Sequence, residues 1–267
     1  VLPWPSWRCV MAGRTTRPAL DFGLRAGLFI RSLALQASWN PQRMQNLGLL
    51  AVMLTWLRCR ARDVGTDRLF CRRYYDYFNT NPYLANYLVG GLVRLEDMRE
   101  RGESLPPDFT ATFRDTVGRA LASLGDQLFW LGLRPTLVMA VCLLGMGGHP
   151  VLVLAVTGAF AAAVMVLRWQ ALGRGYALGL DIVDLLNHPG WHRSIALAKR
   201  AGMLLTGMVA GSYLARVSGL ETAAGGSPLW VGIVVGMGMP LACRRRLPGE
   251  VLVLLALVLG LVLDFAF

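Results

Sequence analysis

The chain has 267 residues, of which 55% are hydrophobic, and its mean hydropathy is +0.47. A soluble domain of this length would be less apolar, and the apolar residues are clustered, so the composition favours a membrane protein. The formal net charge is +11, and nearly all of the cations are arginines. These arginines lie at the ends of apolar runs rather than on one solvated face, which fits contact with anionic lipid and argues against nucleic-acid binding.

Metal, disulfide and catalytic sites find little support in the sequence. The five cysteines form no CxxC pair and their number is odd, so we expect reduced thiols. His188 and His192 flank a Pro-Gly pair, which argues against a helix that presents both to one metal ion. The sequence has no Ser/His/Asp set and no phosphate-binding glycine loop. We therefore expect no catalytic residue, no metal and no cofactor.

Residues 1–30 are expected to precede the folded domain. They lack a continuous apolar core long enough for a signal peptide, and they contain several prolines and arginines. This pattern predicts a disordered cytosolic lead. Residues 31–267 are predicted to form the membrane domain, with a motif-rich half over 31–135 and a transmembrane bundle over 136–267.

The motif-rich half contains two short apolar runs, residues 47–57 and 83–95. They are too short to span a bilayer, and runs of this length are typical of buried core helices or re-entrant hairpins. The arginine-rich connection between them is expected to face the cytosol. Residues 96–115 are charged and are expected to form a cytosolic loop or helix.

The second half contains longer apolar segments. Residues 128–144 and 151–167 are each near the minimum length for a crossing helix, and the glycines and Pro150 between them predict a helical hairpin with a tight turn. Further apolar segments follow at 201–217, 229–242 and 251–267. The fold class predicted is an all-α integral membrane protein with about five transmembrane helices, plus short re-entrant or buried helices in its N-terminal half. Whether 229–242 spans fully is open.

The charges of the connections predict an orientation. Arginines and a lysine gather between residues 168 and 200 and again at 244–246, whereas the connections 145–150 and 218–228 have neither. Placing the cationic connections inside gives a cytosolic N-terminus and an external C-terminus.

Three polar clusters lie beside the apolar segments, at residues 36–48, 77–87 and 124–135. Their amides donate and accept hydrogen bonds, a carboxylate accepts them from hydroxyls, and aromatic faces stack on the C–H side of a sugar ring. Together these groups favour a neutral polyhydroxylated ligand over an ion. The residues expected near a translocation path are Trp39, Asn40, Gln45, Asn79, Asn81, Asp126, Trp130 and Arg134.

Each cluster also has a structural interpretation. Asn40 and Asn81 precede prolines and suit helix caps. The tryptophans suit interfacial anchors or core positions. Asp126 and Arg134 would lie about two turns apart on a continuous helix, near the same face, and are candidates for a structural ion pair. An ionisable residue at membrane depth is costly, which favours a functional role there.

The clusters also carry a family resemblance. RSLALQASWNPQRMQNLGLL, YYDYFNTNPYLANYLVGGLVRLED and GRALASLGDQLFWLGLRPTL resemble the IID membrane subunit of the mannose/fructose/sorbose family of the bacterial sugar phosphotransferase system. AVMVLRWQALGRGYALG is similar to an arginine-aromatic stretch of that family. The resemblance is strongest over residues 31–180. The family usually has histidine before the proline of the second motif, where this chain has Asn81.

The resemblance implies a permease subunit that is not itself an enzyme. In that family, IID assembles with a IIC membrane subunit into a multimeric complex of the bacterial inner membrane that translocates a hexose. Cytosolic IIA and IIB components pass phosphate to the sugar as it enters, so no histidine of this chain is expected to be phosphorylated. The alternative is a degenerate scaffold or regulatory subunit that keeps the fold and partner binding without transport. The sequence does not indicate which hexose is carried.

Overall fold

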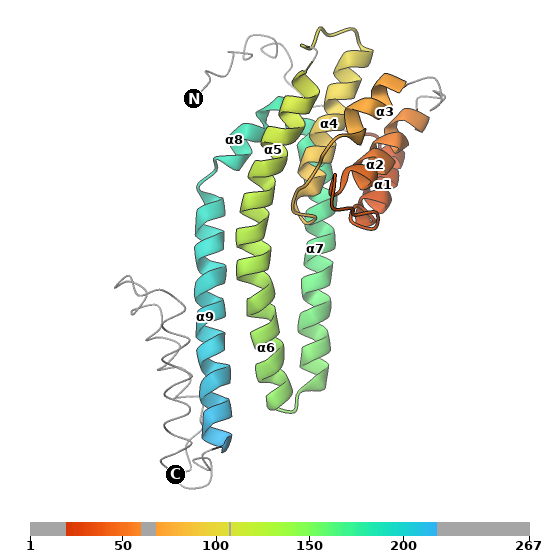
Figure 1. Cartoon of the computed structure of the whole chain (residues 1–267). Helices are drawn as coiled ribbons and strands as arrows, with labels where there is room; N and C mark the ends of the chain where they lie inside the picture. Colours follow the sequence, from red (N-terminus) through yellow and green to blue (C-terminus); the bar gives the residue numbers. More distant parts are fainter. Residues whose placement is uncertain (1–19, 60–67, 107, 218–267) are drawn as a thin grey trace. The chain divides into compact units, whose positions relative to one another are not determined.

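The computed structural model describes residues 20–59, 68–106 and 108–217, and this part of the chain is helical, with no β-strand among the described residues (Figure 1). Two isolated β-bridges connect Asn40 with Met44 and Met44 with Phe78. In chain order the elements are α1 (Phe22–Leu33), α2 (Asn46–Cys59), α3 (Arg68–Tyr75), α4 (Ala85–Glu100), α5 (Phe109–Gly125), the π-helix η2 (Asp126–Leu133), α6 (Arg134–Met146), α7 (Pro150–Leu178), the 3-10 turn η3 (Gly179–Asp181), α8 (Ile182–Leu186) and α9 (Gly190–Val217).

The described residues form two compact units. The N-terminal unit contains the described residues up to Ser123 together with Val164–Asn187, and the C-terminal unit contains Leu124–Ala163 and the described residues from His188 onward. This division differs from the predicted boundary at residue 135. The second half of α7 belongs to the N-terminal unit, where the Asn86 amide donates to the Arg168 carbonyl over 3.0 Å.

Helix α1 begins inside the segment that was expected to be disordered. The Asp21 carboxylate accepts a hydrogen bond from the Leu24 N–H at 3.2 Å and so caps the first turn. Leu24 and Leu28, one turn apart, are buried. The segment predicted to be disordered, residues 1–30, therefore overlaps the start of α1. Its apolar residues at helical spacing, between the arginines, form the buried face of this helix.

Helix α4 is the central helix of the N-terminal unit. Every residue from Ala85 to Met98 is buried, and α2 buries most of its length as well. Both short apolar runs are thus core helices, one of the two structures predicted for them. A helix that is buried on all sides must be covered by neighbours on all sides, and α4 is covered in part by α2 and η3.

Helices α4 and α7 touch through a pair of glycines. A Cβ atom on Gly175 would lie 2.1 Å from the Tyr87 carbonyl oxygen, and one on Gly90 would lie 2.3 Å from the Leu172 carbonyl oxygen. No side chain fits at either position without moving the backbone. The crossing therefore depends on the absence of side-chain atoms at these two sites.

Residues 96–115, predicted to form a cytosolic loop or helix, are largely helical in the structure, and several of their charged side chains are buried. Helix α4 continues to Glu100, and α5 begins at Phe109. Glu96 is 2% exposed and Asp97 is 3% exposed. Acidic side chains are almost never buried unless they are paired, and the partners of these two are described below.

The predicted hairpin is confirmed. Helix α6 ends at Met146, Gly148 adopts a φ of 73° in the turn, and Pro150 is the first residue of α7. A left-handed φ favours glycine, and proline suits the first position of a helix because it has no N–H to leave unpaired.

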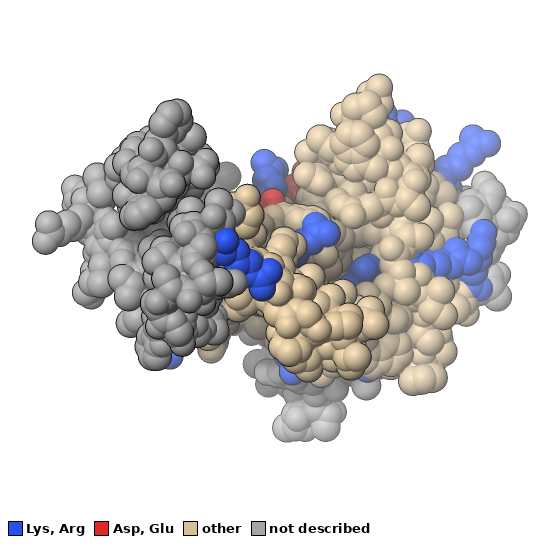
Figure 2. Space-filling view, turned by 90° about the horizontal axis from the view of Figure 1, so that it is seen from below, with Lys and Arg blue, Asp and Glu red and all other residues tan. Residues whose placement is uncertain are grey.

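Two continuous helical segments are long and apolar enough to cross a membrane. They comprise 38 residues from Phe109 to Met146 and 37 residues from Pro150 to Leu186. Only 17% and 6% of their most apolar stretches are buried within the protein, whereas the core helix of a soluble protein would be mostly buried. On the face drawn in Figure 2, most of the described surface is uncharged, and the charged side chains on it are mainly Lys and Arg.

Helix α9 contains the predicted segment 201–217. The predicted segments 229–242 and 251–267, and the arginines at 244–246, lie outside the described residues. The structure thus tests the expectation of about five spans only in part.

The π-helix η2 lies directly before a proline. Pro135 cannot donate a backbone hydrogen bond, and its ring crowds the carbonyl one turn earlier. The preceding Arg134 N–H bonds the Phe129 carbonyl, five residues back, so the wider π turn makes room for the ring.

Small residues let α9 approach η2 and α6 within the C-terminal unit. A Cβ on Gly132 would lie 3.0 Å from the Ala198 Cβ, and one on Gly202 would lie 2.9 Å from the Thr136 hydroxyl oxygen. That hydroxyl lies 2.9 Å from the Gly132 carbonyl and 3.0 Å from the Ala198 carbonyl. Close contact between small residues is the usual way for helices to associate in lipid.

We predict that Gly175→Ala lowers the free energy of unfolding by about 1–3 kcal/mol or more, because the new methyl group must push α7 away from α4. Gly158→Ala is the matched control on the same helix, since nothing lies within 4 Å of its Cβ position. Thermal unfolding of the purified chains in detergent, followed by circular dichroism, measures the difference. Equal melting temperatures for the two variants would contradict the close α4–α7 crossing.

Candidate functional site

The first polar motif folds into a tight loop between α1 and α2. Asn40 and Met44 exchange backbone hydrogen bonds of 3.0 and 2.8 Å, and the Asn40 Oδ1 accepts the Arg43 N–H at 2.8 Å. Asn40 therefore caps a turn rather than a helix. Met44 has a φ of 56°, a left-handed conformation that a non-glycine residue adopts at an energetic cost.

The second polar motif pairs with this loop. The Gln45 N–H donates to the Phe78 carbonyl at 2.8 Å. The Gln45 side chain donates to the Thr80 carbonyl at 2.9 Å and accepts the Thr80 N–H at 3.3 Å, so one amide completes both backbone groups of that residue. The Thr80 hydroxyl in turn donates to the Gly118 carbonyl of α5 at 2.9 Å. Two motifs that lie 35 residues apart thus form one structural element.

A pocket of about 320 Å³ opens beside this element, and we name it the amide pocket. The Asn40 amide donates to the Asn46 Oδ1 at 3.0 Å, and the Asn46 amide donates to the Tyr75 carbonyl at 2.7 Å. The Arg43 guanidinium lies over the Tyr75 ring, 4.6 Å from its centre. The lining residues are Asn40, Gln42, Arg43, Asn46, Leu47 and Tyr75.

A second pocket, of about 310 Å³, is lined by residues from α5 and from the segment 75–80, which also supplies Tyr75 to the amide pocket. Because two of its lining side chains are guanidinium groups, we name it the arginine pocket. It is lined by Tyr77, Phe78, Asn79, Arg114, Asp115, Arg119 and Ala122.

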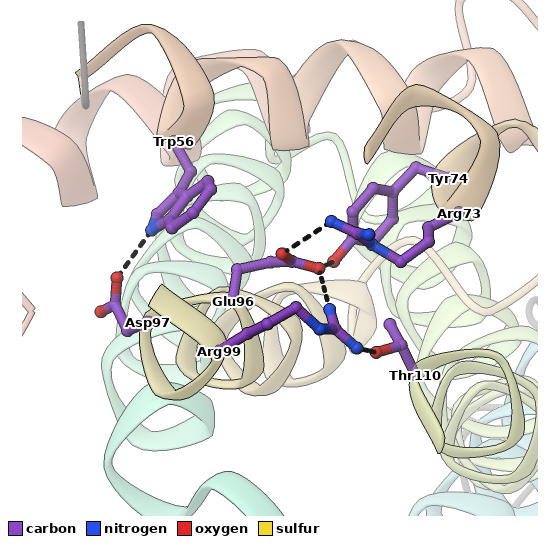
Figure 3. A network of polar contacts seen from close by, with 7 residues as sticks. All are labelled: Trp56, Arg73, Tyr74, Glu96, Asp97, Arg99 and Thr110. Carbon is purple, nitrogen blue, oxygen red and sulfur yellow. Dashed lines mark hydrogen bonds and ion pairs between the residues drawn. The ribbon is translucent and has the colours of Figure 1, made fainter. Parts of the chain in front are cut away.

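Helix α3 and the start of α5 are held to α4 by the Glu96 carboxylate (Figure 3). One oxygen accepts from the Tyr74 hydroxyl at 2.6 Å and from Arg99 at 2.8 Å, and the other accepts from Arg73 at 3.1 Å. Arg99 also donates to the Thr110 hydroxyl at 2.8 Å. A buried carboxylate is tolerated when its oxygens are satisfied and opposite charges lie close, as here.

The neighbouring carboxylate, Asp97, joins two other helices. It accepts from the Trp56 indole of α2 at 2.7 Å and from the Tyr176 hydroxyl of α7 at 2.6 Å. Adjacent residues of α4 thus bind α3 and α5 on the one hand, and α2 and α7 on the other. This arrangement joins α2, α3 and α4, which border the two motif loops.

Burial raises the pKa of Tyr74 well above its ordinary value, and the negative charge of Glu96 and the hydrogen bond to it act in the same direction. Arg73 and Arg99 oppose the shift. The Tyr74 hydroxyl therefore stays protonated at neutral pH and remains a donor to Glu96.

The N-terminal unit contains five of the candidate residues. Trp39 is 54% exposed, and Asn79 is exposed in the arginine pocket. Gln45 and Asn81 are each 2% exposed. The Asn81 Oδ1 accepts the Tyr83 N–H at 3.0 Å and so shapes the turn that leads into α4. Asn40 lines the amide pocket.

The remaining candidates belong to the C-terminal unit. Asp126 is exposed and is the first residue of η2. Arg134 is exposed, and its guanidinium lies over the Trp130 ring at 4.2 Å from the centre, a cation–π contact. The partner that the structure gives Arg134 is thus an aromatic ring one turn earlier on the helix.

Sequence analysis missed the arginine pair of the second pocket. Arg114 lies at the end of the segment 96–115, which is predicted to be a cytosolic loop or helix, and Arg119 lies just beyond it. Phe113, Val117 and Leu121 recur at helical spacing and are all buried, so the periodicity of α5 was the available signal. Nothing in the local sequence indicates that Arg114 would be 4% exposed.

Comparison with known proteins identifies the family. A family model described as "PTS system mannose/fructose/sorbose family IID component" matches residues 24–227. This match covers most of the chain, so the chain belongs to the IID components of the mannose/fructose/sorbose family. The resemblance seen in the polar motifs is confirmed.

Curated relatives agree with this assignment. The mannose-specific EIID component of Escherichia coli K12 is 30% identical over 170 residues, which are 63% of this chain and 60% of that protein. The sorbose-specific EIID component of Lacticaseibacillus casei is 30% identical over 152 residues, or 55% and 52% of the two chains. The fructose permease IID component of Bacillus subtilis is 24% identical over 160 residues. The chain thus matches about three fifths of the length of the mannose-specific relative.

Solved structures share the architecture of this chain. One is the cryo-EM structure of the mannose transporter ManYZ in complex with microcin E492, with a TM-score of 0.55, 21% identity, and coverage of 91% of this chain and 96% of that one. Another, described as the structure of a membrane protein, has a TM-score of 0.66 at 21% identity. At this level of identity the comparison establishes the architecture.

We predict that Gln45→Ala lowers the free energy of unfolding by about 1–3 kcal/mol, because the buried N–H and carbonyl of Thr80 both lose their partner. Gln42→Ala is the matched control, since Gln42 is exposed. Chemical unfolding of both purified variants in detergent measures the difference. Equal stability of the two variants would show that the Gln45 amide does not hold the two motifs together.

Proposed function

We propose that this chain is the IID subunit of a permease that carries a hexose across the bacterial cytoplasmic membrane together with a IIC subunit. Cytosolic IIA and IIB components would supply the phosphate, and the chain itself would perform no catalytic step. Family membership and the two long apolar helices support this proposal. The observation that carries it is the amide pocket, which two distant family motifs build together.

The amide pocket suits part of a sugar. Its volume of about 320 Å³ is at the lower end of the range for small-molecule sites. Gln42 is exposed in the lining, and its carboxamide can donate to and accept from sugar hydroxyl groups. Asn40 and Asn46 bond to each other and to the backbone, and so shape the wall behind it. The exposed ring of Tyr75 offers an apolar face to the C–H side of a hexose.

The candidate residues take different places in this proposal. Asn40 and Asn79 face the two pockets, and Gln45 and Asn81 shape the loops behind them. The other candidates would contribute at the protein surface, through exposed aromatic or charged groups that contact the solute, the IIC subunit or lipid: Trp39, Asp126, Trp130 and Arg134.

The exposed apolar side chains of α6 and of the first half of α7 fit contact with membrane lipid and with IIC in a multimeric complex. The orientation proposed places the N-terminus and the cationic end of α7, with the cations that follow at the start of α9, in the cytosol, and the turn between α6 and α7 outside. The chain would thus be a multi-pass protein of the inner membrane.

We predict that Gln42→Ala reduces the initial rate of hexose uptake about tenfold, the effect of losing roughly 1.4 kcal/mol of hydrogen bonding to the sugar. Gln36→Ala is the matched control, because Gln36 is exposed in the same loop but does not line the pocket. Uptake of a panel of radiolabelled hexoses is measured in cells that express this chain with its IIC, IIA and IIB partners. Equal uptake by the two variants would remove the amide pocket from the transport path.

The same cells distinguish the alternative function. A wild-type chain that copurifies with IIC but supports no uptake of any hexose would identify a scaffold or regulatory subunit.

We predict that Gly147→Cys is labelled by a membrane-impermeant maleimide from outside the cell, and that Asn187→Cys is labelled only after the membrane is opened. Both positions are exposed, and the second follows the cationic end of α7. The five native cysteines are first replaced by serine. The reverse pattern would overturn the proposed orientation.

A further inference from the structure

The arginine pocket contains a guanidinium that the protein itself holds in place. Arg114 is 4% exposed, its Nε donates to the Asp115 carboxylate at 3.0 Å, and its Nη1 donates to the Arg73 carbonyl at 2.7 Å. Within the described part of the chain, no hydrogen bond engages the remaining nitrogen, Nη2, and the residue lines the pocket. A rigid guanidinium with one open nitrogen is pre-organised to donate to a ligand.

Further donors surround the same space. The Arg119 Nε donates to the Asp115 backbone carbonyl at 3.2 Å. Among the described residues, the two terminal nitrogens of Arg119 have no hydrogen-bond partner. Asn79 and Tyr77 are exposed and line the pocket, and each brings a side-chain donor. The one carboxylate of the lining, Asp115, already accepts from Arg114. Two guanidinium groups and one carboxylate leave the lining with a formal positive charge.

The chemistry of this lining fits an oxyanion with several acceptor oxygens. A phosphate monoester has three terminal oxygens, and arginine binds phosphate through parallel N–H···O bonds. The volume of about 310 Å³ is at the lower end of the range for ligand pockets, so it suits a phosphate with a small organic group rather than a nucleotide. The amide pocket differs, since carboxamides dominate its lining.

We propose that the arginine pocket binds a phosphate monoester or diester through Arg114 and Arg119, with Asn79 and Tyr77 as additional donors. Two sources share this chemistry: a soluble phosphorylated metabolite and the headgroup of an anionic lipid. Direct binding, rather than uptake, tests the proposal, so its outcome does not depend on the transport function proposed above.

The experiment uses the full chain in nanodiscs of phosphatidylcholine, which carries no net charge. Glucose 6-phosphate and glucose are titrated in parallel by isothermal titration calorimetry, and inorganic phosphate serves as a second anionic probe. We expect glucose 6-phosphate to bind at least tenfold more tightly than glucose, and the difference to shrink at high salt as the charges are screened. Nanodiscs with phosphatidylglycerol identify the source: competition with glucose 6-phosphate there would support a lipid headgroup, and unchanged affinity would support a soluble phosphate.

Variants locate the binding. Arg119→Gln is expected to weaken glucose 6-phosphate about tenfold, the effect of one charge-assisted hydrogen bond. Arg72→Gln removes an equally exposed arginine that does not line the pocket and is expected to change nothing. Arg114→Lys keeps the charge but loses the hydrogen bonds to Asp115 and to the Arg73 carbonyl that hold the guanidinium in place, and is expected to weaken binding too. Equal affinity for glucose and glucose 6-phosphate, or equal effects of Arg119→Gln and Arg72→Gln, would overturn the proposal.

Discussion

Two adjacent carboxylates of α4, Glu96 and Asp97, are buried in the centre of the N-terminal unit, and each is satisfied by side chains from different helices. Removing a partner from a buried charge costs more than the contact itself is worth, because the charge is left without water or a counter-charge. The positions of α2, α3, α5 and α7 around α4 are therefore coupled to one another. The close approach at Gly90 and Gly175 adds a further constraint on how α7 crosses α4.

This coupling explains how the pockets are built. The loop before α2 and the segment between α3 and α4 meet through Gln45, Thr80 and the bridge at Phe78. Their geometry depends on the helices that flank them, and three of these, α2, α3 and α4, are joined by Glu96 and Asp97. One segment, residues 75–80, supplies lining to both pockets: Tyr75 to the amide pocket, and Tyr77, Phe78 and Asn79 to the arginine pocket. A neutral polyol and a phosphate group are thus proposed to bind on neighbouring parts of one element.

The sequence predicted those features that depend on local pattern. The hairpin around Gly148 and Pro150 follows from residues that disfavour helix continuation, and the short helices α2 and α4 follow from apolar runs too short to cross a bilayer. The motifs also identified the family. The burial of Asp97 was not predictable, because its partners Trp56 and Tyr176 lie 41 and 79 residues away. The same holds for Glu96, whose partners Arg73 and Tyr74 lie 23 and 22 residues away on another helix. The packing of the second half of α7 within the N-terminal unit was not predicted either, because its contacts also join residues far apart in the sequence, such as Asn86 and Arg168.

The most direct test of the coupling is hydrogen–deuterium exchange on the full chain in nanodiscs, comparing Glu96→Gln with Asp97→Asn. Each variant is the control for the other, since the positions are adjacent and both changes are isosteric. We expect Glu96→Gln to increase exchange in α3, in residues 75–80 and at the start of α5, and Asp97→Asn to increase it mainly where α2 and α7 meet α4. Unchanged exchange over 68–80 in Glu96→Gln would contradict the claim that this carboxylate holds the pocket-forming segment in place.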